Sequence, residues 1–399
     1  FKDNIPNTLF IFLGFLSVFL AYYFIMSVVL FDYIYSEFMI NDDVKNLTRA
    51  IAGDPVDNSG NFLLYRLIEM FAHFNSIAIF KVMALVFASF NAGAIFLILW
   101  NLSHRVWFSA LAAIAVCSFP VSSEQIIFVS ASHPLFGMAP ALVSFLVFLW
   151  AKSKKPLIFV AGCFVSSLFA LAAAFLSPIF SLMTLAVVIW VMVAFFQSKN
   201  MVRKYLAAIV LPTLVLAGHS LYGIGNYHYS GTNGMVNYSL STISNNLYES
   251  LNMIVGVFST APMWNVTIIV SVGIITIYAL ISEIRMKKWR FSENSVNNIH
   301  HDRLNFVLLS MLVCSAFSFA PASITTYLFD RYIVASVIFL GIFLICIFLY
   351  IIQGIEKSKS IVFGSSFIIL IVINCFILGN LFEQKYKQIF LTQKDLVTF

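Results

Sequence analysis

Long apolar runs alternate with shorter polar segments along most of the chain. A helix needs roughly 20 apolar residues to cross the hydrocarbon core of a bilayer. By this measure we predict helices at 8–31, 77–100, 107–121, 134–151, 156–175, 178–196, 205–223, 264–282, 304–321, 332–352 and 361–380. The pattern therefore predicts an all-α polytopic membrane protein of about 11 transmembrane helices, forming a single domain over residues 1–399.

The largest polar interruption, 32–76, follows the first apolar run and holds seven of the 17 acidic residues. It closes with the stretch NFLLYRLIEMFAHF, in which apolar residues recur at helical spacing from Leu63 to Phe74. Polar and charged side chains occupy the other face of that helix. This pattern is typical of an amphipathic helix lying flat at a membrane surface.

A second large polar segment, 225–263, contains neither Lys nor Arg. Its first half is rich in Tyr, Asn, Ser and Gly, and its second half predicts another amphipathic surface helix. Neutral hydrogen-bonding and aromatic residues suit sugar hydroxyls and sugar faces, but they suit a membrane interface equally well. The candidates for sugar contact are Tyr227, Tyr229, Asn237 and Tyr238. The expected apolar face consists of Leu240, Ile243, Leu247, Leu251 and Ile254.

Charge is scarce and unevenly placed. Charged residues make up 10% of the chain, against roughly 25% in soluble domains. Fifteen of the 23 Lys and Arg lie at the N-terminus and in five alternate polar loops, whereas twelve of the 17 acidic residues lie on the other side. The positive-inside rule then places the N-terminus in the cytoplasm and both 32–76 and 225–263 outside. The same rule accounts for the basic pI of about 9.0, so nucleic acid is not an expected partner.

Several residue types suggest no chemistry of their own. All five cysteines lie in apolar runs without paired spacing, and we interpret them as small buried hydrophobic residues. His300 and His301 fall in the longest inner loop, 283–303, which we predict to be a surface loop rather than a metal site. Ser177 and Pro178 are expected to form a turn between two helices. No nucleotide-binding, serine-hydrolase or zinc-helix motif is present.

The adjacent carboxylates Asp42 and Asp43 are the leading candidates for catalysis. One of them could act as a general base that takes a proton from an acceptor hydroxyl while a phosphate leaves the sugar. The alternative is a solvated loop in which they cap a short helix. Glu37 is the next candidate for the general base if neither aspartate fills that role. The sequence indicates no certain cofactor, and a divalent cation bound by these carboxylates is an open alternative.

Arg331, at the start of an apolar run and beside Asp330, could hold a phosphate with its fork of donors. The alternative is an interfacial arginine that reaches outward or pairs with Asp330. Arg66 and His133 could assist it, although a histidine at the entrance of a helix is more often structural. Lys81, inside an apolar run, is a weaker phosphate candidate that must face a cavity or reach the interface.

The order of these features resembles the GT-C superfamily of polyprenyl-phosphate-sugar glycosyltransferases. In that superfamily a first span leads to an outer loop with an acidic pair, then to amphipathic surface helices and a second span. Here the pair Asp42–Asp43, the NFLLYRLIEMFAHF helix and the run FKVMALVFASFNAGAIFLILWNLSHR follow that order, and DRYIVASVIFLGIFL looks like a later Arg-Tyr motif before an apolar span. The chain lacks the Lys-Pro-Pro motif of aminoarabinose transferases and the Trp-Trp-Asp motif of oligosaccharyltransferases.

The resemblance implies catalysis on the outer side of a bacterial inner membrane. A lipid phosphate would be held near the membrane surface, and an acidic residue would activate the acceptor. The expected partners are an undecaprenyl-phosphate hexose donor and an acceptor such as O-antigen or another envelope glycan. Two alternatives remain: a glycan polymerase, which should rely more on outer arginines, and a lipid-linked sugar flippase or transporter, which should bury charges within its spans.

Overall fold

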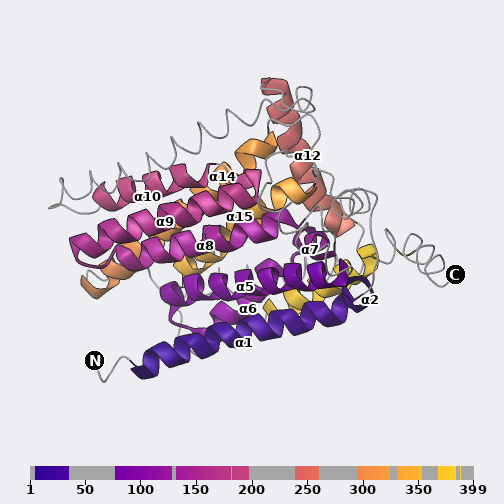
Figure 1. Ribbon diagram of the computed structural model, residues 1–399, viewed down its shortest axis with the longest axis horizontal. Coiled ribbons are helices and arrows are strands. Elements are labelled where there is room, and N and C mark those ends of the chain that lie inside the picture. Colours follow the sequence, from indigo (N-terminus) through magenta and orange to yellow (C-terminus); the bar gives the residue numbers. More distant parts are fainter. Residues whose placement is uncertain are drawn as a thin grey trace, which may run out of the picture.

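Figure 1 shows the computed structural model of the chain, a bundle of helices. The structure describes residues 5–35, 77–127, 132–180, 182–196, 239–259, 295–323, 330–352, 367–382 and 387, and every regular element within these ranges is helical. The helices are α1 (Ile5–Val29), α2 (Phe31–Ile34), α5 (Ile77–Ser103), α6 (Val106–Cys117), α7 (Pro120–Ile127), α8 (His133–Ala151), α9 (Pro156–Leu176), η2 (Pro178–Phe180), α10 (Met183–Phe196), α12 (Leu240–Ser259), α14 (Ser295–Ser323) and α15 (Asp330–Ile352), with a further helix at Phe367–Phe382.

The described helices confirm an all-α membrane protein. Four of them are long and apolar enough to cross a bilayer, with windows at Leu9–Val29, Ala78–Ser103, Pro134–Ala151 and Pro156–Leu176. Shorter apolar helices accompany them at Val106–Cys117, Met183–Ala194, Leu304–Ala320, Ile333–Leu349 and Phe367–Phe382. The predicted helices at 205–223 and 264–282 lie outside the described residues.

Two predictions about element boundaries are wrong. The run 107–121 forms two helices instead of one, because α6 ends at Cys117 and α7 begins at Pro120. A proline has no backbone N–H to donate, and its ring clashes with the carbonyl group four residues earlier, which favours the end of α6 before Pro120. The predicted loop 283–303 is helical from Ser295 onward, which places His300 and His301 within α14.

The twelve residues of α6 span about 18 Å, which is shorter than the roughly 30 Å hydrocarbon core of a bilayer. Backbone carbonyl groups freed at the break between α6 and α7 are bonded by side chains from distant helices. The Tyr22 hydroxyl donates to the Cys117 carbonyl oxygen over 2.9 Å, and the Asn374 amide donates to the Ala115 carbonyl oxygen over 3.2 Å. All these groups are buried in the protein, which is where irregular backbone is tolerated inside a membrane.

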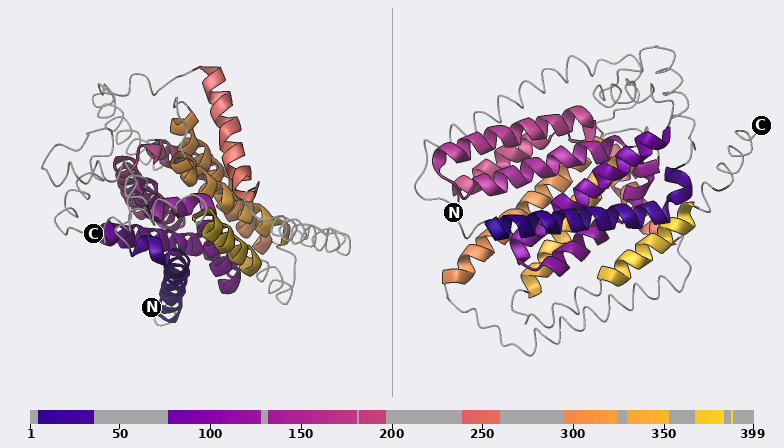
Figure 2. Two further views of the ribbon diagram at one scale, coloured as in Figure 1. Left: turned by 90° about the vertical axis from the view of Figure 1, so that its right-hand side faces the viewer. Right: turned by 60° about the horizontal axis from the view of Figure 1, so that its bottom comes forward.

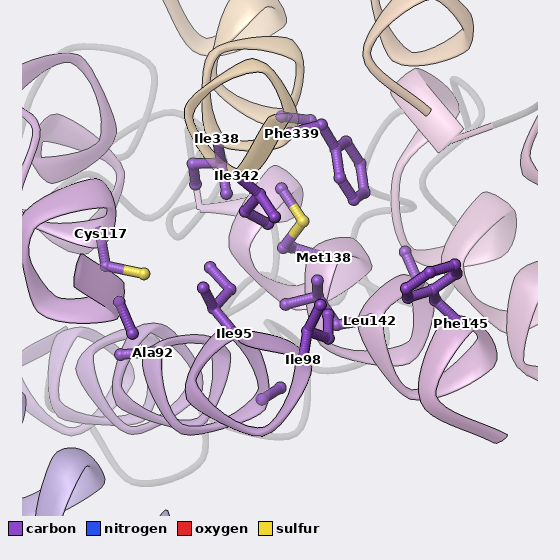
Figure 3. Packing of buried hydrophobic residues seen from close by; sticks show 14 of the residues in the cluster. Ala92, Ile95, Ile98, Cys117, Met138, Leu142, Phe145, Ile338, Phe339 and Ile342 are labelled. Atoms are coloured by element: carbon purple, nitrogen blue, oxygen red, sulfur yellow. The ribbon is translucent and has the colours of Figure 1, made fainter. Parts of the chain in front are cut away.

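Small residues allow neighbouring helices to approach closely. At the α1–α5 interface the ring of Phe96 covers Gly14, and the ring of Phe15 covers Gly93. Small residues at helix contacts are the usual means by which membrane helices pack tightly. Near the middle of the molecule, apolar side chains of α5, α8 and α15 converge (Figure 3), among them Ile95, Ile98, Met138, Leu142, Ile338 and Ile342.

The bundle helices run roughly antiparallel, so their termini gather at two ends (Figures 1 and 2). At one end, called the α2 end below, α1 leads into α2, and α5, α8 and α15 begin. At the opposite end α1 begins and the α8–α9 connection lies. The side chains described at the opposite end include four basic residues, Arg105, Lys152, Lys154 and Lys155.

Candidate functional site at the α2 end of the bundle

The segments with sequence-predicted site residues join the bundle at the α2 end. The described chain stops at Tyr35, directly after α2, and resumes at Ile77, where α5 begins. Both points lie at this end in Figure 1. His133 is the first residue of α8, and Arg331 is the second residue of α15. The helices therefore bring the backbone at two predicted phosphate-binding residues to the same end of the molecule.

The other predicted site residues lie outside the described residues. They are the carboxylates Glu37, Asp42 and Asp43, the cation Arg66, and the sugar-contact candidates Tyr227, Tyr229, Asn237 and Tyr238.

Lys81, the weaker phosphate candidate of the sequence analysis, lies buried at this end. It lies in the second turn of α5, its side chain is 0% exposed, and its Nζ donates to the backbone carbonyl oxygen of Tyr33 over 2.8 Å. The last carbonyl groups of a helix have no partner within that helix. Lys81 therefore serves α2 as an external hydrogen-bond donor, and its amino group is buried at this end of the bundle.

Two contacts between Tyr33 and Phe382 also hold α2 in place. The Tyr33 hydroxyl donates to the Phe382 carbonyl oxygen over 3.3 Å, and the two aromatic rings lie 5.2 Å apart. α2 is thus held between α5 and the helix at Phe367–Phe382. The same end buries two more polar side chains, Gln125 on α7 and Ser132 directly before α8.

No protein-family model, curated protein or solved structure matched the chain. Any chemistry assigned to the α2 end therefore has to come from the properties of its own residues.

Helix α12 crosses the α2 end at a steep angle to the bundle (Figures 1 and 2) and packs against α14, α15 and α7. Ser239 caps its N-terminus, because the Thr242 backbone N–H donates to the Ser239 hydroxyl over 3.1 Å. Asn246 and Ser250 form its buried edge, and the Asn246 amide donates to the carbonyl oxygen of Ser323 in the last turn of α14 over 2.9 Å. These contacts fix the rotation of α12 about its own axis.

Two other faces of α12 are exposed. One is apolar and includes Leu240, Leu247 and Leu251, which confirms the amphipathic helix predicted from these positions. The other is polar and includes Ser241, Asn245, Tyr248 and Asn252. The sequence pattern identified the apolar face, but it gave no sign that the edge docked on α14 would be Asn246 and Ser250.

Metal and thiol chemistry find no support among the described residues. No group of three or more His, Cys, Asp or Glu side chains gathers anywhere in the described ranges. The five cysteines all lie in these ranges and are free thiols, and Cys117, Cys163, Cys314 and Cys346 are buried. Their prediction as small buried hydrophobic residues is confirmed for these four.

Proposed function

We propose that the protein transfers a sugar from a polyprenyl-phosphate-linked donor to a hydroxyl group of an envelope glycan, as the resemblance to GT-C glycosyltransferases implies. One observation carries the proposal: a fully buried lysine, Lys81, lies at the end of the bundle where the backbone at His133 and Arg331 also lies. The chain between α2 and α5, which contains the acidic pair, leaves and rejoins the bundle at this same end.

Lys81 and Arg331 supply positive charge for the donor phosphate, with Arg66 and His133 assisting. A buried charge is screened less than an exposed one, so an ammonium group held at 0% exposure acts strongly on an anion nearby. The bond from Lys81 to Tyr33 fixes the position of this charge relative to α2. An arginine adds a planar fork of donors that matches two phosphate oxygens.

An outer-loop carboxylate activates the acceptor. A sugar hydroxyl is a weak nucleophile, and a positioned general base is worth roughly 10²–10⁴-fold in rate. Asp42 and Asp43 fill this role, with Glu37 in reserve, while Tyr227, Tyr229, Asn237 and Tyr238 contact the sugars. Adjacent residues point about 100° apart on a helix, so one aspartate of the pair is the base and the other supports it.

The charges of the described residues support the orientation that this reaction needs. Arg105, Lys152, Lys154 and Lys155 lie at the end opposite α2, against Lys81 and Arg331 at the α2 end, and basic residues concentrate on the cytoplasmic side of membrane proteins. In this orientation the α2 end faces outward from a bacterial inner membrane. The apolar face of α12 then rests on the outer surface of the bilayer, as an amphipathic surface helix does.

A second candidate, a lipid-linked sugar flippase or transporter, is favoured by the α6–α7 break and by the burial of Lys81 within the candidate span α5. Interrupted helices at membrane depth often mark the substrate sites of transporters. Near the break Asn374 is buried, and its side-chain oxygen has no hydrogen-bond partner. A transporter would move the donor across the bilayer without attaching its sugar to an acceptor.

The deciding experiment reconstitutes the purified protein in liposomes with a radiolabelled undecaprenyl-phosphate hexose and an O-antigen acceptor. Labelled glycan is the expected product, and movement of the donor between leaflets without product would favour the second candidate. Asp42→Asn and Asp43→Asn should reduce transfer unequally, one abolishing it and the other weakening it. Glu249→Gln, a carboxylate on α12 with no assigned role, is the matched control, and a parallel assay with chelator tests the divalent cation.

A further inference from the structure

The exposed polar face of α12 forms a single line of side chains. Ser241, Asn245, Tyr248 and Asn252 follow one another at spacings of four, three and four residues, so they lie on one face of the helix. All four are exposed, and the Tyr248 side chain is 62% exposed. At 1.5 Å per residue the line extends over about 16 Å.

Because α12 buries Asn246 and Ser250, this line of exposed side chains lies on the side of the helix away from the bundle. Tyr248 follows the buried Asn246 by two residues, which is about 200° around a helix. Because Asn246 bonds to Ser323 of α14, this rotation is fixed by a specific contact. The line therefore points to the side of α12 that faces neither α14 nor the apolar stripe of Leu240, Leu247 and Leu251.

The composition of this face is unusual for a helix surface. An exposed face is normally filled with strong helix formers such as Lys, Glu and Ala, whereas Ser and Asn favour helices less. Glu249 is the single charged residue of α12. The exposed polar face of α12 thus carries residues that favour helices weakly, at positions where packing does not require them. Each of the four side chains offers a neutral hydrogen-bonding group.

These groups match an uncharged sugar chain. Each asparagine amide offers two donors and an acceptor oxygen, so it can bond to neighbouring hydroxyl groups. The exposed tyrosine ring offers an apolar face on which the C–H face of a sugar ring can stack, and its hydroxyl adds a polar tip. The absence of Lys and Arg from α12 disfavours phosphates and acidic polysaccharides.

We infer that Ser241, Asn245, Tyr248 and Asn252 form a binding surface for an uncharged oligosaccharide. The ligand class rests on these side chains together with their position away from both the apolar stripe and α14, and the identity of that oligosaccharide as the acceptor rests on the proposed function. Tyr248 supplies the main apolar contact. Asn245 and Asn252, on either side of it, hold the flanking sugar units.

Direct binding tests this surface without any need for catalysis. The full chain in lipid nanodiscs is titrated with maltohexaose, cellohexaose and isomaltohexaose, and binding is followed by saturation-transfer NMR. Wild type should bind at least one of them, and Tyr248→Ala should weaken that binding at least tenfold, while Tyr248→Trp retains it. Leu240→Ala, a change at an exposed side chain on the apolar stripe, is the matched control and should bind as wild type.

Failure of wild type to bind any of the three oligosaccharides would overturn the inference, and so would equal binding by Tyr248→Ala. A transfer assay distinguishes failure of the binding surface from failure of the proposed function. Tyr248→Ala should raise the acceptor KM while kcat and the donor KM stay unchanged. If wild type binds oligosaccharide but transfers no sugar, the proposed function fails and the binding surface stands. If wild type transfers sugar and Tyr248→Ala leaves the acceptor KM unchanged, the binding surface fails alone.

Discussion

Ser144 and Ser166 are bonded to each other reciprocally across the α8–α9 interface. The Ser144 hydroxyl donates to the Ser166 carbonyl oxygen over 2.8 Å, and the Ser166 hydroxyl donates to the Ser144 carbonyl oxygen over 2.9 Å. Both side chains are buried. Farther along the same interface Gly162 packs directly on Ala151. The α8–α9 pair is therefore joined by polar bonds within a close apolar contact.

Ser144→Ala and Ser166→Ala should each destabilise the protein by about 0.5–1.5 kcal/mol. Because the two hydroxyl groups form one unit, the double variant should lose less than the sum of the single losses. Thermal unfolding in detergent measures all three variants. Ser153→Ala, at an exposed serine after α8, is the control and should stay near wild type. Strictly additive losses would contradict the reciprocal pair.

Gly93→Ala should destabilise the α1–α5 contact by about 1–3 kcal/mol, the usual cost of overpacking. The new Cβ would lie 2.5 Å from the Phe15 ring, so that ring must move. Gly379→Ala is the matched control, since its new Cβ would meet nothing within 4 Å. It should stabilise the helix by about 0.5–1 kcal/mol. Equal stability changes in the two variants would show that the Phe15 ring shifts without cost.

Lys81→Met keeps the length of the side chain and removes its charge. Transfer at limiting donor should fall by about 10- to 100-fold, the value of a hydrogen bond to a charged group. Lys81→Arg should retain more activity than Lys81→Met, because it preserves the charge. Steady-state kinetics beside a thermal-stability measurement separates binding from folding. Wild-type donor KM in a stable Lys81→Met protein would remove Lys81 from the phosphate site.

Cysteines placed at the two ends of the bundle should react from opposite sides of the membrane. In a cysteine-free background, Ser241→Cys should react with an impermeant thiol reagent in intact cells. Lys154→Cys should react after the membrane is permeabilised. Both positions are exposed, so the reagent can reach either of them once it has access to that side. The reverse result would invert the orientation and place the α2 end in the cytoplasm.

Hydropathy predicted the long helices well because each one is a separate apolar run. The runs 8–31, 77–100, 134–151, 156–175 and 332–352 correspond to α1, α5, α8, α9 and α15 within a few residues. The beginning of α14 was missed because its first turns, from Ser295, are polar. The end of α6 was missed because the apolar residues continue past the break, although Pro120 marks the place where a new helix begins.

The candidate site was harder to predict, because its described contacts join residues far apart in the chain. A lone lysine in an apolar run, Lys81, was a recognisable signal for a buried polar side chain. Its acceptor, the backbone carbonyl group of Tyr33, has no sequence signature, and neither has the bond from Tyr33 to Phe382. The rotation of α12 depends on a single bond to Ser323 that periodicity cannot indicate.

The α6–α7 break has a consequence for the order in which the protein assembles. Tyr22 is synthesised before α6, whereas Asn374 follows Ala115 by 259 residues. Until the helix at Phe367–Phe382 enters the membrane, the Ala115 carbonyl oxygen has the Ser118 hydroxyl as a donor but lacks the Asn374 amide, and a lost hydrogen bond in hydrocarbon is costly. The geometry of the break is therefore completed late in biosynthesis. A ribosome-bound chain that has not yet reached Asn374 should hold α6 and α7 in a different arrangement from that of the finished protein.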